Sequence, residues 1–331
     1  MNEFHAVITG LGSYLPEKVY TNTDLERMVD TNDEWIVQRT GIKERHIARE
    51  DEYTSDLATE AAKNALQDAG MGAEELDFIL VATVSPDMYT PSVSCLVQRN
   101  IGAVNAMCMD INTACSGFVN AVSVADQFIR TGHCKKVLVI GADTLSKITN
   151  YQDRATCILF GDGAGAAVLE AQEGAAGVIS TASGADGASA EKLYCGGLLE
   201  PDWCDEKVKP IHKPRTLWMN GGEVMKFAVR AMTHAALKVL QDAGLTIDDV
   251  DWIIPHQANI RIIDGARKRL GIPEEKVFTN LAHVGNMSGA SIPVAFNEAY
   301  RQGLFQKGDK IILVGFGAGL TWAAALLEWN K

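Results

Sequence analysis

The sequence predicts an α/β protein made of two homologous halves. Short, continuously apolar segments alternate with helical patterns, which is typical of sheets covered by helices. The segment that begins at Asn64 recurs from Lys238, 174 residues later, which indicates an internal duplication. The composition, with 47% hydrophobic and 22% charged residues, is that of an ordinary globular protein. We therefore expect halves near residues 1–172 and 173–331 that pack into five layers, α/β/α/β/α.

The elements of the first half follow this alternation in order. A short strand over 6–10 comes first, and an amphipathic helix over 56–69 ends at Gly70, a residue type favoured just after helices. The helix over 116–130 is apolar on nearly every face and should therefore be buried. The other expected elements are strands over 78–81, 105–111 and 137–140.

The second half repeats these elements at one constant offset. The strand that begins at Lys136 recurs at Lys310, and Asn112 falls on Asn286. The repeat is far longer than the roughly 20–50 residues of solenoid repeats, so it indicates a duplicated fold. Residues 183–220 lack the alternation and contain many Gly, Asp, Pro and Lys residues, so we expect an irregular surface excursion there.

Charge, hydropathy and cysteine content narrow the class of protein. The formal net charge of −12 argues against a surface for nucleic acid or for an anionic membrane. No apolar run approaches the ~18 residues of a membrane span, and residues 1–5 lack the features of a signal peptide. The 7 cysteines, without paired CxxC spacing, are expected to be reduced and mostly buried. We expect a cytoplasmic protein that binds neither nucleic acid nor membrane.

Two glycine-rich segments invite comparison with nucleotide-binding loops. Residues 161–166 formally fit the dinucleotide fingerprint, but residues 167–170 are too few for the helix that must follow it. We expect a glycine-rich strand that packs closely against another backbone there. Residues 315–319 also follow a strand, and we expect a turn whose backbone N–H groups can approach a substrate.

Cys115 is the cysteine with the strongest chemical context. It follows a strand and opens the buried helix, with Asn112 or Thr113 as the expected cap. A thiol at a helix N-terminus feels the positive end of the helix dipole, which favours the thiolate. The other cysteines lie in apolar runs or connecting segments and lack this context. Position alone leaves Cys115 open as either a nucleophile or a structural thiol.

A histidine and an asparagine of the second half are the candidate partners of this thiol. His256 directly follows a strand and should point into a crevice, although a core histidine would fit the same position. Asn286 precedes the helix that matches the helix of Cys115, where it could equally serve as a cap. Duplicated halves would bring Cys115 and Asn286 to equivalent helix starts, which favours one shared site.

Over essentially its whole length, the sequence resembles the β-ketoacyl-acyl-carrier-protein synthase III family, the condensing enzymes that initiate bacterial fatty acid synthesis. The motifs that carry the resemblance are Asp33–His46, Ala114–Phe118, Gly161–Gly165, Pro255–Arg261, Gly285–Asn286 and Gly315–Gly319. The resemblance implies the thiolase fold and a triad of Cys115, His256 and Asn286. It also implies an oxyanion hole formed by the backbone N–H groups of Cys115 and Ala318.

The same resemblance implies the substrates and their contacts. An acyl-CoA primer and malonyl-acyl-carrier protein would give 3-oxoacyl-carrier protein, CoA and CO₂ in a homodimer that needs no cofactor and no metal. The residues implied for CoA and its pantetheine are Trp35, Arg39, Arg154, Gly221 and Asn259. Those implied for the carrier protein are Gln257, Ala258, Asn259, Ile260, Arg261, Lys226 and Lys268. Those implied for the acyl pocket are Thr90 and Phe316.

The charge pattern beside His256 bears on the carrier protein. Residues 256–270 hold four basic side chains, Arg261, Arg267, Lys268 and Arg269, against the single acid Asp264. Such a run is commonly a solvated face. Next to a site mouth, however, it would also steer an acidic carrier protein.

Four positions depart from the family pattern. Met287 stands at a common threonine, Val284 at a tyrosine or histidine, and Ala318 at a glycine. Thr90 stands where many relatives have a phenylalanine that reaches the partner subunit's acyl pocket. We hypothesise that the smaller Thr90 admits a primer longer or more branched than acetyl.

Two other functions remain open from the sequence. A thiolase-fold acyltransferase of secondary metabolism would share the triad but use a free or CoA-bound acceptor. A binding protein on the same scaffold would need no nucleophile, and the intact set of Cys115, His256 and Asn286 argues against it.

Overall fold

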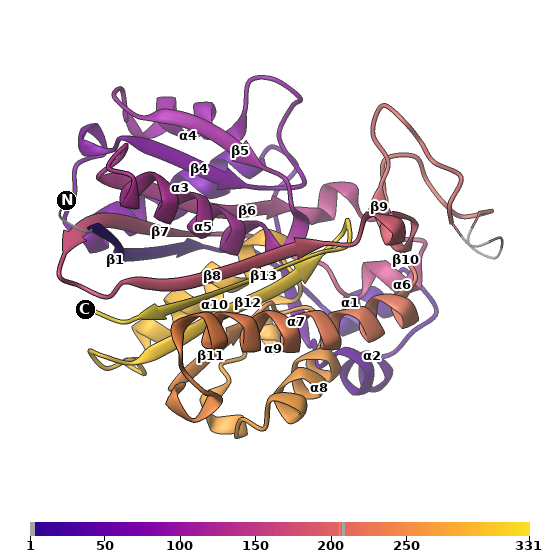
Figure 1. The fold of residues 1–331 in the computed structure, drawn as a ribbon. Coiled ribbons are helices and arrows are strands. Elements are labelled where there is room, and N and C mark those ends of the chain that lie inside the picture. Colours follow the sequence, from indigo (N-terminus) through magenta and orange to yellow (C-terminus); the bar gives the residue numbers. More distant parts are fainter. Residues whose placement is uncertain (1–3, 205, 207–208) are drawn as a thin grey trace.

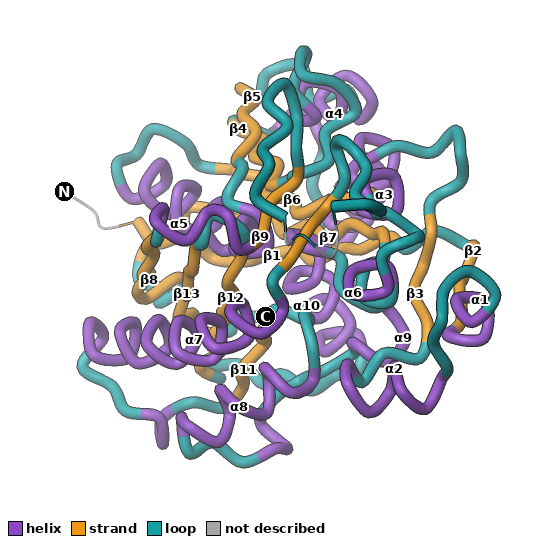
Figure 2. Tube along the Cα trace, turned by 90° about the vertical axis from the view of Figure 1, so that its right-hand side faces the viewer, coloured by secondary structure: helices purple, strands orange, loops and turns teal. Residues whose placement is uncertain are grey.

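The computed structural model describes residues 4–204, 206 and 209–331. Residues 1–3, on which the expected lack of a signal peptide partly depends, lie outside this range. Two main sheets lie one above the other with helices between and outside them (Figures 1 and 2). None of the helices in the described part of the chain is long and apolar enough to cross a membrane.

The first sheet belongs to the first half of the chain. Its strand order is β1-β7-β6-β4-β5, and the strands are β1 (Phe4–Tyr14), β4 (Phe78–Ala82), β5 (Met107–Ile111), β6 (Lys136–Thr144) and β7 (Asp162–Glu173). The apolar run of β4 is buried on both faces: Phe78, Leu80 and Ala82 pack toward the middle of the molecule, and Ile79 and Val81 pack outward. This alternation explains the continuous apolar pattern of the strand.

The second sheet repeats this arrangement. Its order is β11-β12-β13-β8, and the strands are β8 (Val178–Ala185), β11 (Trp252–Pro255), β12 (Lys310–Gly317) and β13 (Thr321–Glu328). In both sheets a parallel pair, β4 with β6 and β11 with β12, continues into antiparallel strands. The expected strands and their order along the chain are therefore present, with ends that differ by a few residues.

The helices form the remaining three layers. The middle layer is α5 (Gly117–Arg130) and α10 (Ser291–Arg301), which share one core with the inner faces of both sheets. One outer layer is α3 (Thr54–Ala69) with α4 (Val93–Ile101), and the other is α7 (Gly221–Ala243) with α8 (Ile260–Leu270). In Figure 2, α4 lies at the top and α8 at the bottom, with the sheets between them. The predicted five-layered α/β/α/β/α arrangement is confirmed.

The offset of 174 residues reappears in three dimensions. Short 3₁₀ turns, Ala114–Ser116 and Ser288–Ala290, directly precede α5 and α10. Ala114 and Ser288 are matching residues of these turns, and both have a left-handed backbone, with φ of 49° and 48°. The repeat thus extends to an unusual backbone conformation at both helix starts. The division of the chain at residues 172 and 173 into two domains stays a prediction.

Smaller elements complete the fold. They are α1 (Asn22–Glu26), α2 (Asp33–Thr40), α6 (Arg154–Cys157), α9 (Leu281–Val284) and the two-stranded sheets β2 (Lys18–Thr21) with β3 (Glu44–Ile47) and β9 (Leu193–Cys195) with β10 (Leu217–Met219). The expectation of an irregular excursion over 183–220 is therefore wrong in part. Its ends form β9 and β10, which pair because Leu193, Tyr194, Leu217 and Trp218 are apolar and buried.

Other local expectations have mixed outcomes. The glycine-rich segment 161–166 enters β7 with no following helix, and a Cβ at Gly165 would lie 2.6 Å from the backbone nitrogen of Val294. The expected close approach of two backbones is confirmed. All seven cysteines are free, but only Cys134, Cys157 and Cys204 are buried, so the expectation that most would be buried is wrong.

Candidate active site

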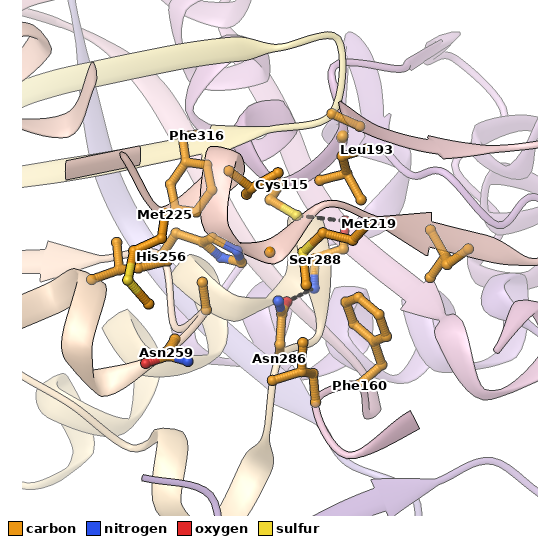
Figure 3. Close-up of a pocket in the computed structure, with 18 of the residues that line it drawn as sticks. Cys115, Phe160, Leu193, Met219, Met225, His256, Asn259, Asn286, Ser288 and Phe316 are labelled. Atoms are coloured by element: carbon orange, nitrogen blue, oxygen red, sulfur yellow. Dashed lines mark hydrogen bonds between the residues drawn. The ribbon is translucent and has the colours of Figure 1, made fainter. Parts of the chain in front are cut away.

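A cavity of about 820 Å³ lies where the two halves meet. Cys115, His256 and Asn286 all line it, although they come from three separate segments of the chain (Figure 3). Most of the remaining lining is apolar, and includes Leu145, Phe160, Leu193, Leu217, Met219, Met225 and Phe316. The structure therefore brings together the thiol, the imidazole and the amide that the sequence singled out, in a largely apolar pocket.

Cys115 lies in the 3₁₀ turn just before α5. Its Sγ donates a hydrogen bond to Ser288 Oγ at 3.4 Å, and burial raises the pKa of the thiol to about 12. The direction of this pKa change is opposite to the one expected from the helix start, because burial disfavours the charged thiolate. Thr113 is the N-cap residue of this turn, one of the two expected, but its side chain makes no capping hydrogen bond and instead accepts one from Asn120. Cys115 rests as a neutral thiol.

His256 follows the end of β11 and is 1% exposed. Its backbone N–H donates to the carbonyl of Val314 at 2.8 Å, which extends the pairing of β11 with β12. Neither ring nitrogen has a hydrogen-bond partner within the described part of the chain. Burial lowers the pKa of the imidazole to about 3, so the ring is neutral near pH 7 and offers one N–H donor. An unpartnered, buried imidazole that lines a cavity points to a ligand.

Asn286 is fixed by its backbone and by its side chain. Its N–H donates to Leu159 and its carbonyl accepts from Gly161, both at 2.9 Å, which ties the residue to the first half of the chain. Its Oδ1 accepts the N–H of Ser288 at 2.9 Å. Because the carbonyl oxygen of the amide is occupied in this way, Nδ2 is the donor that remains for a ligand in the cavity.

Gly317, at the end of β12, lies against the backbone of Cys115. A Cβ at this position would lie 2.5 Å from Cys115 N. The repeat shows what a side chain does at the matching position: Asp143, at the end of β6, accepts the N–H of Gly289, the residue that matches Cys115, at 3.0 Å. Glycine at 317 offers no such acceptor to the Cys115 N–H.

The cavity mouth carries an aromatic ring between two cations. The guanidinium carbons of Arg39 and Arg154 each lie 4.8 Å from the ring centroid of Trp35. Arg154 also donates to the carbonyl of Asp30 at 2.7 Å, and Asn259 Nδ2 donates to the carbonyl of Arg39 at 3.0 Å. A planar, anionic molecule would meet both a stacking surface and positive charge here.

Comparison with known proteins agrees with this geometry. Family models described as 3-oxoacyl-[acyl-carrier-protein] synthase III and as its C-terminal part match residues 109–187 and 240–329. The curated β-ketoacyl-[acyl-carrier-protein] synthase III of Caldanaerobacter subterraneus is 55% identical over 98% of both chains. That of Clostridium acetobutylicum is 51% identical, with the same coverage of both. This chain belongs to the β-ketoacyl-acyl-carrier-protein synthase III family.

Solved structures give the same assignment. The enzyme of Thermus thermophilus, at 48% identity, covers 98% of this chain and 99% of its own, with a TM-score of 0.92. That of Aquifex aeolicus, at 45% identity, covers 98% of this chain and all of its own, with a TM-score of 0.91. The fold is therefore the thiolase fold of β-ketoacyl-acyl-carrier-protein synthase III, and the chain belongs to a family of acyltransferases.

The structure also places the residues that the family resemblance assigned to CoA and the acyl chain. Trp35, Arg39, Gly221, Asn259, Phe316 and Ala318 line the cavity. Arg154 lies beside it against Trp35. Thr90 is exposed on the segment before α4 and lies outside the lining, so its expected role in a partner's pocket stays a prediction.

The residues expected to contact the carrier protein divide into two groups. Arg261, Lys226 and Lys268 are exposed, and Arg261 also lines the cavity. Gln257 is fully buried, and Ala258 is 6% exposed. Their side chains face inward, and a contact of this segment with the carrier protein stays a prediction.

Local packing explains why these positions are hidden or only partly exposed. Gln257 turns inward because its Nε2 donates to the carbonyl of Pro255 at 2.8 Å and its Oε1 accepts from the backbone N–H groups of Asn280 and Leu281. Ile260 is half-buried over Gly41. Arg267 is paired with Asp264 and Glu274, so the exposed part of the basic cluster is smaller than the sequence indicates.

Two of the departures from the family pattern lie in the core. Met287 and Val284 are both fully buried and pack with Leu15, Ala290 and Val294. A Cβ at Gly163 would lie 2.6 Å from Met287 Sδ, so methionine fills the space over a glycine of β7. These departures therefore concern packing between the halves.

Sequence reasoning missed two contributors to the site. Ser288 lines the cavity and contacts both Cys115 and Asn286. Asp143 is fully buried and fixes the turn after Asn286 through Gly289. The repeat held a signal for both, because Ser288 matches Ala114, the neighbour of Cys115, and Asp143 matches Gly317.

Proposed function

We propose that this chain condenses an acyl-CoA primer with malonyl-acyl-carrier protein, with loss of CO₂, to start fatty acid synthesis. The observation that carries the proposal is the convergence of Cys115, His256 and Asn286 on one cavity with a cationic, aromatic mouth. The family to which the chain belongs supports the same reaction.

In the first half-reaction, Cys115 sulfur bonds to the carbonyl carbon of the primer thioester. The bond between that carbon and the CoA sulfur breaks, and CoA leaves with the thiol proton of Cys115. The backbone N–H groups of Cys115 and Ala318 hold the oxyanion of the tetrahedral intermediate. The glycine at 317, which leaves the N–H of Cys115 without a carboxylate acceptor, supports this role for Cys115.

In the second half-reaction, His256 and Asn286 donate hydrogen bonds to the malonyl thioester carbonyl. Loss of CO₂ places negative charge on that oxygen, so the two donors stabilise the transition state more than the ground state. The resulting carbanion attacks the acyl-Cys115 carbonyl, and the C–S bond to Cys115 breaks to give the 3-oxoacyl product. The thiolate then takes up a proton. Decarboxylation supplies the driving force, and we propose that no metal or cofactor takes part.

The neutral imidazole of His256 fits this role. With its pKa near 3, the ring carries one N–H that can be donated and no charge that would bind the leaving CO₂ or the substrate carboxylate tightly. Asn286 contributes Nδ2 because its Oδ1 is held by Ser288. Both donors are therefore set before substrate arrives, which is what electrostatic stabilisation requires.

The substrates would approach from the side of Trp35. We propose that Trp35 stacks on the adenine ring of CoA and that Arg39 and Arg154 bind the phosphates of CoA. Gly221 and Asn259 would line the path of its pantetheine arm. Phe316 lies edge-on to His256, with ring centroids 5.5 Å apart, and limits the apolar space beside Cys115. An acidic carrier protein would dock on the exposed cations Arg261, Lys226 and Lys268.

We also propose that the enzyme is a cytoplasmic homodimer. β5 is the edge strand of its sheet, and its apolar side chains are only partly covered; Met109 is 44% exposed. A second copy pairing along β5 would cover this edge. In that dimer Thr90, close before α4, would reach the partner's acyl pocket.

The small side chain of Thr90 should then admit a primer longer or more branched than acetyl. Initial rates with acetyl-, isobutyryl- and octanoyl-CoA test this hypothesis, and strict preference for acetyl-CoA would contradict a wider pocket.

A second reaction is favoured by one comparison. The priming β-ketosynthase of the R1128 polyketide pathway is 34% identical over 99% of this chain, with a TM-score of 0.91. A free or CoA-bound acceptor of secondary metabolism could thus replace the fatty acid carrier protein. Product formation with malonyl-acyl-carrier protein and with malonyl-CoA, measured on the same acylated enzyme, separates the two reactions. Turnover with malonyl-CoA alone would overturn the first proposal.

A further inference from the structure

Ser288 joins the thiol and the amide of the candidate site. Its Oγ lies 3.4 Å from Cys115 Sγ, and its backbone N–H donates to Asn286 Oδ1 at 2.9 Å. In Figure 3 it lies between Cys115 and Asn286, with a dashed line to each. Because Ser288 is only 3% exposed, a water molecule cannot easily take the place of its hydroxyl as the hydrogen-bond partner of Cys115. One residue therefore contacts two groups that belong to different halves of the chain.

The backbone of Ser288 is held in a conformation that serine rarely adopts. Its φ of 48° is in the left-handed region, where glycine is favoured and where other residues cost of order 1 kcal/mol or more. Three contacts hold the turn in place: Met287 N–H to Ser291 Oγ, Gly289 N–H to Asp143 Oδ2, and Ser288 N–H to Asn286 Oδ1. The turn thus directs the Ser288 hydroxyl at Cys115.

We propose that Ser288 is a positioning residue that orients the thiol of Cys115 at rest and stabilises its thiolate during acyl transfer. A hydroxyl can both accept and donate, because its hydrogen rotates about the C–O bond. At rest it accepts the S–H of Cys115. Negative charge develops on the Cys115 sulfur as its proton passes to the departing CoA, and again when the C–S bond breaks to release the product; at both points Ser288 donates its O–H to the sulfur. No bond to carbon forms at Ser288, and its proton stays on its own oxygen.

This role matters because other surroundings disfavour the thiolate. Burial and the charge of Asp143 raise the pKa of Cys115, whereas the Ser288 hydroxyl lowers it. Neither nitrogen of His256 has a partner in the described part of the chain, so no hydrogen bond joins its ring to Cys115 in this state. Ser288 is then the side chain in place to assist the sulfur before substrate binds. The inference rests on the proposed function, since it assumes that Cys115 is the nucleophile.

Alkylation of Cys115 by iodoacetamide tests the inference without the condensation reaction. The rate follows the thiolate fraction, and mass spectrometry of peptides separates Cys115 from Cys95, an exposed thiol that serves as internal standard. We expect Ser288→Ala to slow Cys115 alkylation about tenfold between pH 7 and 9, which corresponds to a rise of about one pH unit in the profile. Alkylation of Cys95 should not change.

Two further variants separate the hydroxyl from the backbone. Ser288→Gly also lacks the hydroxyl, but glycine adopts the left-handed backbone without strain. Its Cys115 should therefore be alkylated as slowly as in Ser288→Ala, while the variant unfolds at a higher temperature than Ser288→Ala. Ser123→Ala removes a partly buried hydroxyl of α5 that donates to the carbonyl of Val119 and takes no part in this turn, and it should keep the wild-type pH profile. A wild-type rate in Ser288→Ala, or a rate restored by Ser288→Gly, would overturn the inference.

The two proposals can fail separately. An acyl adduct on wild-type Cys115 with no effect of Ser288→Ala on alkylation would leave the proposed function standing and overturn the role of Ser288. Slowed alkylation with no acyl adduct on the wild-type enzyme would support the effect of Ser288 on the thiol and contradict the proposed function.

Discussion

Asp143 and Gly317 occupy matching positions near the ends of β6 and β12, and the difference between them gives only one of the two matching turns a carboxylate acceptor. Asp143 accepts the N–H of Gly289, together with groups of Thr83, Val84 and Ser85. Gly317 leaves the equivalent N–H, that of Cys115, without this acceptor. A duplicated fold has thus kept the turn in both halves and removed one side chain where a substrate oxygen is expected.

Gly317→Ala should therefore disable the site, and because the backbone must shift to admit the new Cβ it should also lower the free energy of unfolding. The new Cβ would lie 2.5 Å from Cys115 N and 3.2 Å from Thr113 O, both backbone atoms that cannot turn aside. We expect acylation of Cys115 to slow by about 100-fold or more, as for the loss of an oxyanion donor. Stopped-flow release of CoA measures this step. Gly187→Ala, where a Cβ meets nothing within 4 Å, is the matched control. Equal rates in both variants would contradict the assignment of the Cys115 N–H.

His256 should make the protein less stable as the pH falls below 6.5. Its pKa is about 3 in the folded protein against 6.5 for an ordinary histidine, so the unfolded chain binds more protons between these values. This contribution is complete above pH 6.5 and is lost progressively as the pH falls toward 3. Between pH 7.5 and 5.5 we expect it to reduce the free energy of unfolding by about 1 kcal/mol.

Urea unfolding of the wild type and of His256→Gln at both pH values measures that difference. The variant should lose less stability than the wild type on acidification, whereas His234→Gln, at an exposed position on α7, should behave as the wild type does. Identical pH dependence in wild type and His256→Gln would show that the imidazole is not held neutral by burial.

Trp35 should contribute to binding of CoA but not to the chemistry at Cys115. Loss of the ring removes a stacking surface between two guanidinium groups, an interaction of about 1–2 kcal/mol, so Trp35→Ala should raise KM for acyl-CoA about tenfold. The kcat at saturating acyl-CoA should change little. Tyr53→Ala, which removes another ring that contacts a cation, Lys147, is the control. A fall in kcat without a change in KM would contradict this role.

The exposed cations near the mouth should matter for the carrier protein alone. We expect the double variant Lys226→Glu and Lys268→Glu, at exposed positions outside the cavity lining, to raise KM for malonyl-acyl-carrier protein at least tenfold at low salt, with a smaller effect at high salt. Acylation by acyl-CoA should continue. Lys63→Glu, on the outer helix α3, tests whether any reversed charge has this effect. A salt-independent loss, or an equal loss for Lys63→Glu, would contradict docking at this surface.

The five layers could be predicted because the sequence contains both the apolar periodicity of the strands and helices and the internal duplication. The strand β4 is apolar at every position, and the offset of 174 residues is also present in the turns at Ala114 and Ser288. The convergence of Cys115, His256 and Asn286 followed from the same symmetry. When two residues lie on matching elements of a duplicated fold, their proximity can be predicted from the sequence alone.

Other features depend on three-dimensional context that no local pattern contains. A helix start suggested an activated thiol, but the depth of the pocket reverses the direction of the pKa change at Cys115. Gln257 is polar and adjacent to a basic run, yet its amide is used inside the turn. β9 and β10 pair across more than twenty residues, so their sequences read as an isolated excursion. Ser288 lacks a motif and is revealed by its contacts.

The central claim is that Cys115 carries the acyl group, and one measurement tests it most directly. Intact-protein and peptide mass spectrometry after mixing the enzyme with acetyl-, isobutyryl- or octanoyl-CoA should show one acyl group on Cys115. The adduct should be absent in Cys115→Ser and should disappear on addition of malonyl-acyl-carrier protein. An enzyme that remains unmodified with every primer, or that carries the acyl group on another cysteine, would contradict the account.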